Sequence, residues 1–596
     1  MNPEAQFAAA REAIRVGRFA DAEASLRALL GVAPGHPLVL SLLGVALRGQ
    51  GRFEEALEPA RRSAEAAPSN PGVLVNLGVV LIDAGRHDEA SEVLTRAVGV
   101  APGVVEARVA LSRAMSLGGR LLDAADLCRE SLGMARDHPK LTANLGAALL
   151  YAGEGAAAIE AYQRGTERWP EDLTLAMGLA ASLVYGGTDD AGAVAAAHRR
   201  VGALIAKAEG THEPPAIADP DPERRVRVGV MCADFRAHAS AFFLAPILEH
   251  ADRDRVEYVL YSTGGREDEV TARFRAWAPS YHRVSHLDPA ALCARVRGDG
   301  VDVLLDLSGY AEGHRQAAFQ RRGAPLQGTY LAYASTTGLP AMDFRIVDSI
   351  TDPAGEAEAF NTERLVRIEP CLLAFSKGAG LRGGAAEHPA PGEPGQRDGP
   401  ITFGSFRGLQ LLTDKTLDLW TAVLKGVPGS RLLMRNHGLS GRRERDHTLA
   451  RFTSRGLDAA RILLEGPTSG AGETLKEYAR LDVVLDSFPY SGTTTTCESL
   501  LMGVPIVTLM GATSASRVSA SIQQHAGAGD LVAHTPEQFV SIAAGLAGDR
   551  ERLATLRREL PERFERTVGD GAAFARRFEA VIREQWGEAC RRQGRG

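Results

Sequence analysis

The sequence predicts an α-helical solenoid of paired helices followed by two α/β lobes. Three observations support this prediction: glycines spaced 34 residues apart in the first third of the chain, a break rich in proline and acidic residues at 207–224, and apolar strands that alternate with helical stretches after it. At 596 residues the chain is too long for one core, since domains usually have about 100–200 residues.

The spacing of 34 residues is the period of tetratricopeptide repeats, which are pairs of antiparallel helices. Six glycines carry it: Gly17, Gly51, Gly85, Gly119, Gly153 and Gly187. Alanines keep the same phase where two helices must approach closely: Ala22, Ala56, Ala90, Ala124 and Ala158. We expect each glycine to occupy a turn with a left-handed backbone, which costs glycine little. Residues 1–206 are therefore predicted to be a repeat array that binds a protein partner.

The bulk composition argues against several classes of protein. A net charge of -6 disfavours a general nucleic-acid surface, and no apolar run approaches the roughly 18 residues that span a bilayer. The N-terminal segment is already in repeat phase and lacks the apolar stretch of a secretory signal. The six cysteines are scattered without a Cys-x-x-Cys pair, which suits reduced thiols and indicates no zinc site. We therefore expect a cytoplasmic protein.

Short apolar runs alternate with helical stretches from residue 225 onward, which predicts βαβ units around parallel sheets. A segment dense in Gly, Pro and Ala, residues 377–400, divides this region into lobes of residues 225–376 and 401–596. The expected strands lie at 226–231, 256–262, 301–307 and 326–333 in the first lobe and at 401–406, 430–435, 461–466, 481–488 and 504–510 in the second. Ligands of such folds bind at the carboxyl ends of the strands, here in a cleft between the lobes.

The segment DSFPYSGTTTTCESLLMG, residues 486–503, places four threonines between a buried strand and an apolar helix: Thr493, Thr494, Thr495 and Thr496. Threonine hydroxyls and the free N–H groups of a helix N-terminus form a site for a nucleotide phosphate, and Glu498 is placed to accept hydrogen bonds from a ribose. Alternatively, the threonines only cap the helix and Glu498 favours its dipole. Four consecutive threonines exceed what capping needs, so we favour the phosphate site.

This segment resembles the donor-binding signature of the SPINDLY branch of the O-linked N-acetylglucosamine transferase family. Three more motifs are similar to blocks of that branch: ADFRAHASAFF at 233–243, STTGLPAMDFRIVDSITDP at 335–353 and SASRVSAS at 514–521. The resemblance covers essentially the whole chain and implies a GT-B (double Rossmann-like) catalytic region. It also implies inverting transfer of a sugar from a nucleotide donor to Ser or Thr of a protein, with neither metal nor other cofactor.

His238 follows the first strand of the first lobe, and the resemblance makes it the candidate catalytic base. Inverting transfer needs a route for the proton of the acceptor hydroxyl. A histidine that caps a helix or packs beside a loop is the competing interpretation. The DPD of residues 219–221 imitates an Asp-x-Asp metal motif, but it lies in the Pro-rich linker, so we expect no metal there.

The resemblance places Ser308 and Tyr310 where the first lobe meets the sugar and the acceptor. A glycine-containing turn after another strand is expected to line the same cleft, through Thr336, Thr337 and Gly338. Arg517, in the SASRVSAS block, is expected near the nucleotide sugar. The alternatives are ordinary turn chemistry and a solvated arginine at a helix start.

Two positions depart from the SPINDLY pattern. Leu411, in GSFRGLQL at 404–411, stands where the family has a lysine that contacts the donor diphosphate, and Thr474 stands where it usually has a histidine. Either the chain has lost activity and survives as a binding protein, or its donor is not a nucleoside diphosphate sugar. Arg407 replaces an asparagine of the pattern, and it either supplies part of the lost charge or is simply exposed.

We favour a changed donor, because a CMP-activated nonulosonic acid carries a single phosphate. Similar bacterial members transfer such sugars to flagellin, which their repeats hold. The leading hypothesis is a cytoplasmic protein O-glycosyltransferase whose repeats select the acceptor. The alternatives are a tetratricopeptide adaptor or chaperone with an inactive transferase-like domain, and a GT-B-fold enzyme, such as an epimerase, that acts on small molecules. An extended array argues against the last of these.

Overall fold

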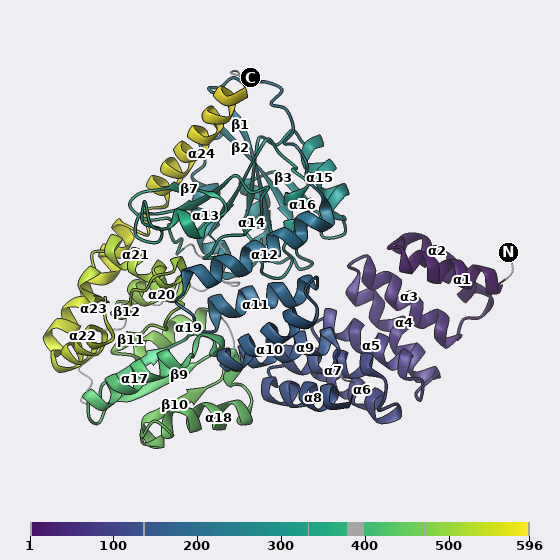
Figure 1. The fold of residues 1–596 in the computed structure, drawn as a ribbon, viewed down its shortest axis with the longest axis horizontal. Coiled ribbons are helices and arrows are strands. Elements are labelled where there is room, and N and C mark those ends of the chain that lie inside the picture. Colours follow the sequence, from purple (N-terminus) through teal and green to yellow (C-terminus); the bar gives the residue numbers. More distant parts are fainter. Residues whose placement is uncertain (1–2, 135–136, 332, 378–398, 469–470, 594–596) are drawn as a thin grey trace. The chain divides into compact units, whose positions relative to one another are not determined.

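The computed structural model describes residues 3–134, 137–331, 333–377, 399–468 and 471–593 (Figure 1). The chain divides into two compact units, of which one comprises residues 1–152 and 160–169 and the other residues 153–159 and 170–596. Most of the predicted connection at 377–400 lies outside the described residues.

The first unit is built from successive helix pairs. Its helices are α1 (Pro3–Arg15), α2 (Phe19–Val32), α3 (Pro37–Gly49), α4 (Phe53–Ala66), α5 (Pro71–Asp83), α6 (His87–Val100), α7 (Val105–Leu117), α8 (Leu121–Met134), α9 (Pro139–Tyr151) and most of α10 (Gly155–Arg168). The six periodic glycines all adopt positive φ, between 75° and 118°. The five in-phase alanines are all 0% exposed. Both observations confirm the repeat predicted from the 34-residue spacing.

The last helix pair belongs to the second unit. Helices α11 (Leu173–Tyr185) and α12 (Ala191–Glu209) pack against each other, and Val201 and Ile205 of α12 share a buried cluster with Met231 and Tyr261 of the first sheet. A Cβ on Gly202 would lie only 1.8 Å from a backbone oxygen of the first lobe, so glycine is required for this approach. The end of the repeat array therefore shares a core with the first lobe.

The first lobe contains a parallel sheet in the order β3-β2-β1-β4-β5-β6-β7. Its elements are β1 (Val226–Cys232), α13 (Ala239–Glu249), β2 (Val256–Ser262), α14 (Glu269–Trp277), β3 (Ser280–Arg283), α15 (Pro289–Gly298), β4 (Val303–Asp306), α16 (Gln316–Gln320), β5 (Leu326–Tyr330), β6 (Phe344–Val347) and β7 (Arg364–Arg367). The four predicted strands are confirmed. Strands β3, β6 and β7 were not predicted, because each has four residues and includes arginine, so none forms an apolar run.

The second lobe contains a parallel sheet in the order β10-β9-β8-β11-β12-β13. Its elements are β8 (Thr402–Ser405), α17 (Asp414–Gly426), β9 (Arg431–Arg435), α18 (Arg442–Thr453), β10 (Ile462–Glu465), α19 (Ala471–Glu477), β11 (Val483–Leu485), α20 (Thr494–Leu501), β12 (Ile506–Leu509), α21 (Val518–His525), β13 (Val532–Ala533), α22 (Pro536–Gly548), α23 (Arg550–Arg566) and α24 (Gly571–Gln593). The five predicted strands are confirmed, and the two-residue β13 is additional.

Helix α24 ends the described chain and returns from the second lobe to the first (Figure 1). Trp586 donates from Nε1 to the carbonyl of Asp221 at 3.3 Å, and Gln593 exchanges two hydrogen bonds with the backbone of Ile217. The DPD segment at 219–221 is therefore packed against this helix.

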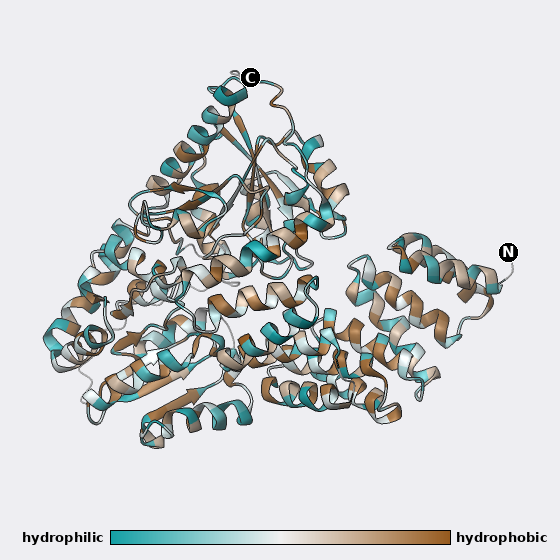
Figure 2. Cartoon of the chain, in the orientation of Figure 1, coloured by the Kyte–Doolittle hydropathy of each residue, from teal (hydrophilic) through white to brown (hydrophobic). Residues whose placement is uncertain are grey.

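Hydrophobic residues are frequent on the strands of both sheets, whereas helices such as α18 are largely hydrophilic (Figure 2). Within the described residues, no helix has the length and apolar character needed to cross a membrane. All six cysteines are buried and unpaired.

Candidate active site

His238 stands at the N-terminus of α13, a few residues after β1. Its Nδ1 lies 2.8 Å from Ser240 Oγ and 3.5 Å from a carboxylate oxygen of Asp234, while 43% of its side chain is exposed. Burial lowers the pKa of the imidazole below its usual value, against the opposing effect of Asp234. When Nδ1 carries the proton, Nε2 is the basic nitrogen, and it has no hydrogen-bond partner among the described residues.

His238 also caps its helix, since the backbone N–H of Ser240 lies 3.3 Å from Nδ1. That bond requires the proton on Nε2, so capping and general-base chemistry use different tautomers of the ring. Both interpretations from the sequence therefore correspond to contacts at this position.

The threonine segment follows β11 and opens α20. Asp486 is buried and holds the turn before it, because its carboxylate accepts hydrogen bonds from the N–H groups of Ser487 at 2.9 Å and Gly492 at 3.0 Å. Thr493 occupies the N-cap position of the helix. Thr496 points into the protein, where its hydroxyl lies 2.9 Å from that of Ser519.

A cavity of about 260 Å³, here called the donor cleft, lies between the lobes. His238 lines it from the first lobe, and Thr493, Thr494, Thr495 and Arg407 line it from the second. The predicted base and three of the four predicted threonines thus face one space at the carboxyl ends of strands.

Glu498 and Thr496 are not among the residues that line the donor cleft. Glu498 is 7% exposed, and one of its carboxylate oxygens accepts a hydrogen bond from the Tyr478 hydroxyl at 3.3 Å. Its predicted contact with a ribose remains a prediction.

Arg517 lines a second cavity of about 400 Å³, here called the junction cavity, which is bounded by the start of α12 and both lobes. Its Nε donates to the carbonyl of Gly511 at 2.8 Å and its Nη1 to the carbonyl of Ile350 in the first lobe at 3.2 Å. Arg517 therefore connects the lobes beside the donor cleft instead of lining it.

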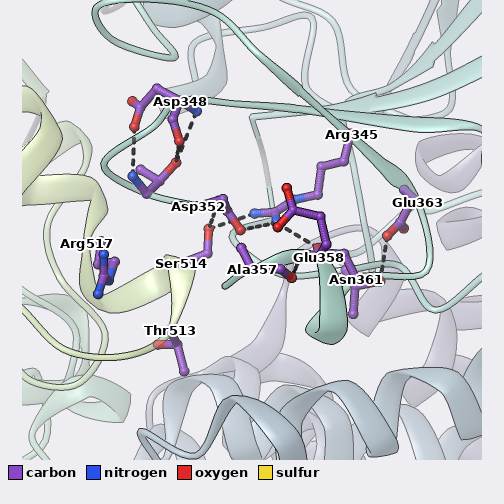
Figure 3. A network of polar contacts seen from close by, with 12 residues as sticks. Arg345, Asp348, Asp352, Ala357, Glu358, Asn361, Glu363, Thr513, Ser514 and Arg517 are labelled. Carbon is purple, nitrogen blue, oxygen red and sulfur yellow. Dashed lines mark hydrogen bonds and ion pairs between the residues drawn. The ribbon is translucent and has the colours of Figure 1, made fainter. Parts of the chain in front are cut away.

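A buried polar network is drawn in Figure 3, and it includes residues that line both cavities. Arg345 pairs with Asp352 at 3.1 Å, and both side chains are almost fully buried. Ser514 of the second lobe accepts from Arg345 and donates to Asp352, each at 2.8 Å. Ala334, Arg345 and Ser514 line both cavities. The network closes the contact between the lobes at this point, and sequence reasoning missed it because its residues are far apart in the chain.

Of the other residues predicted in the first lobe, four are buried and Tyr310 is half-buried; the buried ones are Ser308, Thr336, Thr337 and Gly338. Tyr310 donates a hydrogen bond to the carbonyl of Thr337, and the hydroxyl of Ser308 accepts from Ala233 N–H at 3.3 Å. Thr336 Oγ1 donates to the buried carboxylate of Glu363 at 2.6 Å, and the backbone N–H of Thr337 does so at the same distance.

Four of these residues line neither cavity: Ser308, Tyr310, Thr337 and Gly338. Thr336 lines only the junction cavity. Gly338 has φ of +68° and lies against the backbone of His198 in α12. These first-lobe residues therefore pack behind the wall of the donor cleft. The composition of the turn alone does not predict these contacts.

Tyr333 and Tyr490 line the donor cleft and were not selected from the sequence. Tyr490 lies within the DSFPYSG segment, and its ring contacts that of Tyr185 in α11, with 4.9 Å between the centroids and 32° between the ring planes. Tyr490 is visible in the sequence as part of this motif, but its contact with Tyr185 is not, because the two residues are about three hundred positions apart in the chain. Among the described residues, no group of three or more His, Cys, Asp or Glu side chains is placed to hold a metal ion.

A helical repeat array joined to two parallel-sheet lobes, with a cleft at the carboxyl ends of their strands, defines a repeat-bearing protein with a two-lobed fold of the GT-B kind. The chain belongs to glycosyl transferase family 41, whose family model matches residues 181–372 and 394–574. Two tetratricopeptide repeat models match residues 7–71 and 47–115. These matches confirm the predicted fold class.

The chain is 34% identical over 382 residues to the Arabidopsis thaliana protein named "Probable UDP-N-acetylglucosamine--peptide N-acetylglucosaminyltransferase SPINDLY", covering 62% of this chain and 40% of that protein. It is 25% identical over 480 residues to a Caenorhabditis elegans UDP-N-acetylglucosamine--peptide N-acetylglucosaminyltransferase, covering 61% and 41%. The chain thus spans about two fifths of the length of these curated relatives. A solved structure of a Thermobaculum terrenum O-GlcNAc transferase mutant is similar with a TM-score of 0.77 and 31% identity, covering 93% of this chain and 98% of that chain.

Proposed function

We propose that the chain is a protein O-glycosyltransferase, which transfers a sugar from a nucleotide donor to a serine or threonine hydroxyl of a protein. One observation carries the proposal: His238 and Thr493, Thr494 and Thr495 line the same cavity from opposite lobes. A base and a helix N-terminus that favours anions, facing one space, suit this reaction. Membership of family 41 and the printed names of the relatives support a sugar donor and a protein acceptor.

In the proposed reaction, Nε2 of His238 takes the proton of the acceptor hydroxyl as the hydroxyl oxygen attacks the anomeric carbon. The bond between that carbon and the phosphate oxygen breaks, and the nucleotide leaves with the electron pair. The threonine hydroxyls and the N–H groups at the start of α20 stabilise the charge on the leaving phosphate. Attack opposite the leaving group inverts the anomeric configuration, and the scheme uses no metal ion.

The proposed donor is a CMP-activated nonulosonic acid. Leu411 is 6% exposed, and the Thr474 hydroxyl lies 2.7 Å from that of Thr468. Neither residue supplies a charge to offset a second phosphate, whereas the phosphodiester of a CMP-linked sugar carries only one negative charge.

The proposed acceptor is flagellin, bound by the repeat array. Repeats of this kind present an extended surface to a protein partner, and the resemblance to flagellin-modifying bacterial members motivates this choice. The proposed location is the cytoplasm, because six buried, unpaired cysteines suit a reducing compartment.

The test is to incubate the purified full chain with flagellin and a CMP-activated nonulosonic acid, and to measure the intact mass of flagellin. We expect the mass to rise by whole nonulosonic acid residues, with and without EDTA, and not to rise with the His238→Ala variant. With UDP-N-acetylglucosamine in place of the CMP-sugar, a hexosamine mass would contradict the donor but not the transferase. Binding of flagellin without any modification would favour the adaptor alternative.

A further inference from the structure

We infer that Arg407 binds the phosphate of the donor and matches the cleft to donors with a single phosphate. This inference rests on the proposed function. Arg407 follows β8, the first strand of the second lobe, and its side chain is partly buried at the wall of the donor cleft. Of the two alternatives left open by the sequence, charge compensation and simple exposure, this placement supports the first.

The guanidinium of Arg407 is anchored on the threonine segment. Nη1 donates to Thr495 Oγ1 at 3.2 Å and Nε to Ser487 Oγ at 3.2 Å. Nη2 donates to the carbonyls of Tyr490 at 3.2 Å and Ser491 at 2.9 Å. The guanidinium carbon also lies 5.6 Å from the centre of the Tyr490 ring. The charge is therefore held beside the three threonines that line the cleft.

All of these partners are neutral. Among the described residues, no carboxylate lies within ion-pair distance of Arg407. The other arginine that lines the cleft, Arg345, is already paired with Asp352. Arg407 consequently supplies the uncompensated positive charge of the cleft, and an anion that enters meets no competing carboxylate on it.

The geometry of the contacts favours exchange with a phosphate. A guanidinium has five N–H groups, and the four contacts leave one of them unused. Three of the four are 3.2 Å long, beyond the usual optimum of about 2.9–3.0 Å. Phosphate oxygens accept shorter, charge-assisted bonds from arginine. One cation offsets the single charge of the phosphodiester in a nucleoside monophosphate sugar but not both charges of a diphosphate.

Isothermal titration calorimetry of the full chain with CMP, CDP and cytidine tests this inference. We expect Arg407→Gln to weaken CMP binding about 10- to 100-fold and to leave cytidine binding unchanged, because only the phosphate loses its partner. We expect CDP to bind the wild-type chain no more tightly than CMP. The matched control is Arg431→Gln, which changes an exposed arginine of β9 in the same lobe and should leave both affinities unchanged.

Arg407→Lys separates charge from structure, since it retains the charge but not the planar fork that holds the turn. We expect Arg407→Lys to bind CMP more tightly than Arg407→Gln. Equal losses in both variants, with cytidine binding also reduced, would make Arg407 a purely structural residue and overturn the inference.

Three further outcomes separate this inference from the proposed function. Wild-type CMP affinity in Arg407→Gln would refute the phosphate contact even if the wild-type chain modifies flagellin. The phosphate contact would also be refuted if Arg407→Gln kept its affinity for CMP but no longer bound free N-acetylneuraminic acid. Arg407 would then bind the carboxylate of the sugar. Loss of CMP binding in the variant, together with no transfer by the wild-type chain, would support the phosphate contact and reject the transferase.

Discussion

Nε2 of His198 lies 2.8 Å from the hydroxyl oxygen of Tyr333, so that helix α12 of the last repeat holds a side chain in the wall of the donor cleft. Nδ1 of the same ring lies 2.6 Å from the carbonyl oxygen of Val194. A carbonyl only accepts, so Nδ1 carries the proton and Nε2 accepts from the Tyr333 hydroxyl. Burial lowers the pKa of His198 to about 4, so the ring is neutral near pH 7, and α12 is coupled to the cleft through this bond.

Replacing His198 with phenylalanine should destabilise the protein. The variant leaves the Tyr333 hydroxyl without its acceptor, which costs about 1–3 kcal/mol in the free energy of unfolding. Urea titration monitored by circular dichroism measures this loss. The double variant His198→Phe, Tyr333→Phe should recover part of it, because the unpaired hydroxyl is gone, and His534→Phe, which changes an exposed histidine, should cost little. If His198→Phe were as stable as the wild type, the bond between His198 and Tyr333 would make no contribution to the free energy of unfolding.

The pH dependence of stability should carry a contribution from His198. Burial lowers its pKa from 6.5 to about 4 in the folded protein. The unfolded chain therefore binds more protons between these values, so the stability that His198 contributes is complete above pH 6.5 and is lost as the pH falls toward 4. Unfolding free energies measured across this range should fall less steeply in His198→Phe than in the wild type. Parallel curves would contradict the prediction.

His238→Ala should reduce glycosyl transfer by a factor of about 10² to 10⁴, which is the usual range for a general base, without unfolding the chain. Burial lowers the pKa of His238, so in the wild type kcat/KM should be constant above pH 6.5 and fall below that pKa as the imidazole gains a proton. The Asp234 carboxylate opposes the shift, and Asp234→Asn should therefore move the acidic limb to lower pH. If the acidic limb of the kcat/KM profile did not move in Asp234→Asn, His238 would be excluded as the titrating group.

Glu363→Gln should destabilise the first lobe by about 2–3 kcal/mol, since the buried carboxylate accepts hydrogen bonds from the Thr336 hydroxyl and from the backbone and hydroxyl of Thr337. An amide replaces one acceptor oxygen with a donor, which leaves a threonine donor unpaired. Thermal unfolding of this variant and of Glu312→Gln, which changes an exposed glutamate in the same lobe, measures the difference. Equal melting temperatures would mean that the carboxylate is not needed there.

Gly51→Ala should destabilise the repeat array by about 1 kcal/mol, although an added Cβ would meet no atom within 4 Å. The cost is conformational, because Gly51 has φ of +75°. Gly35 is matched to it, with the same open surroundings but no positive φ, and Gly35→Ala should be neutral or slightly stabilising. Chemical unfolding of both variants compares them, and equal effects would remove the backbone explanation.

Much of the fold was predictable from local pattern. The 34-residue spacing predicted helix pairs with glycine in the turns, and the apolar runs predicted nine strands, because each signal lies within one short segment. Strands β3, β6 and β7 were not predicted, because their pairing with neighbouring strands defines them more than their composition does.

The candidate site was only partly predictable. The threonine run and His238 stand out in the sequence, and His238 and three of the four threonines line the donor cleft. Thr337 and Gly338 belong to the same kind of motif, yet they pack against Glu363 and α12. Whether a motif residue faces a cavity or a neighbouring helix depends on the packing of distant segments, which no local pattern encodes.

The sequence by itself determined the repeat period and the order of the apolar strands along the chain, and it places leucine at position 411, where the resemblance implies a lysine, because each is a matter of residue identity and spacing. Only the tertiary structure decided which charge stands beside the threonine segment. Arg407 is one more arginine in the sequence, but folding brings it against Thr495 and Tyr490, more than eighty residues away, with no carboxylate to neutralise it among the described residues. A charge acquires its function from the groups that surround it, and those groups are assembled by the fold.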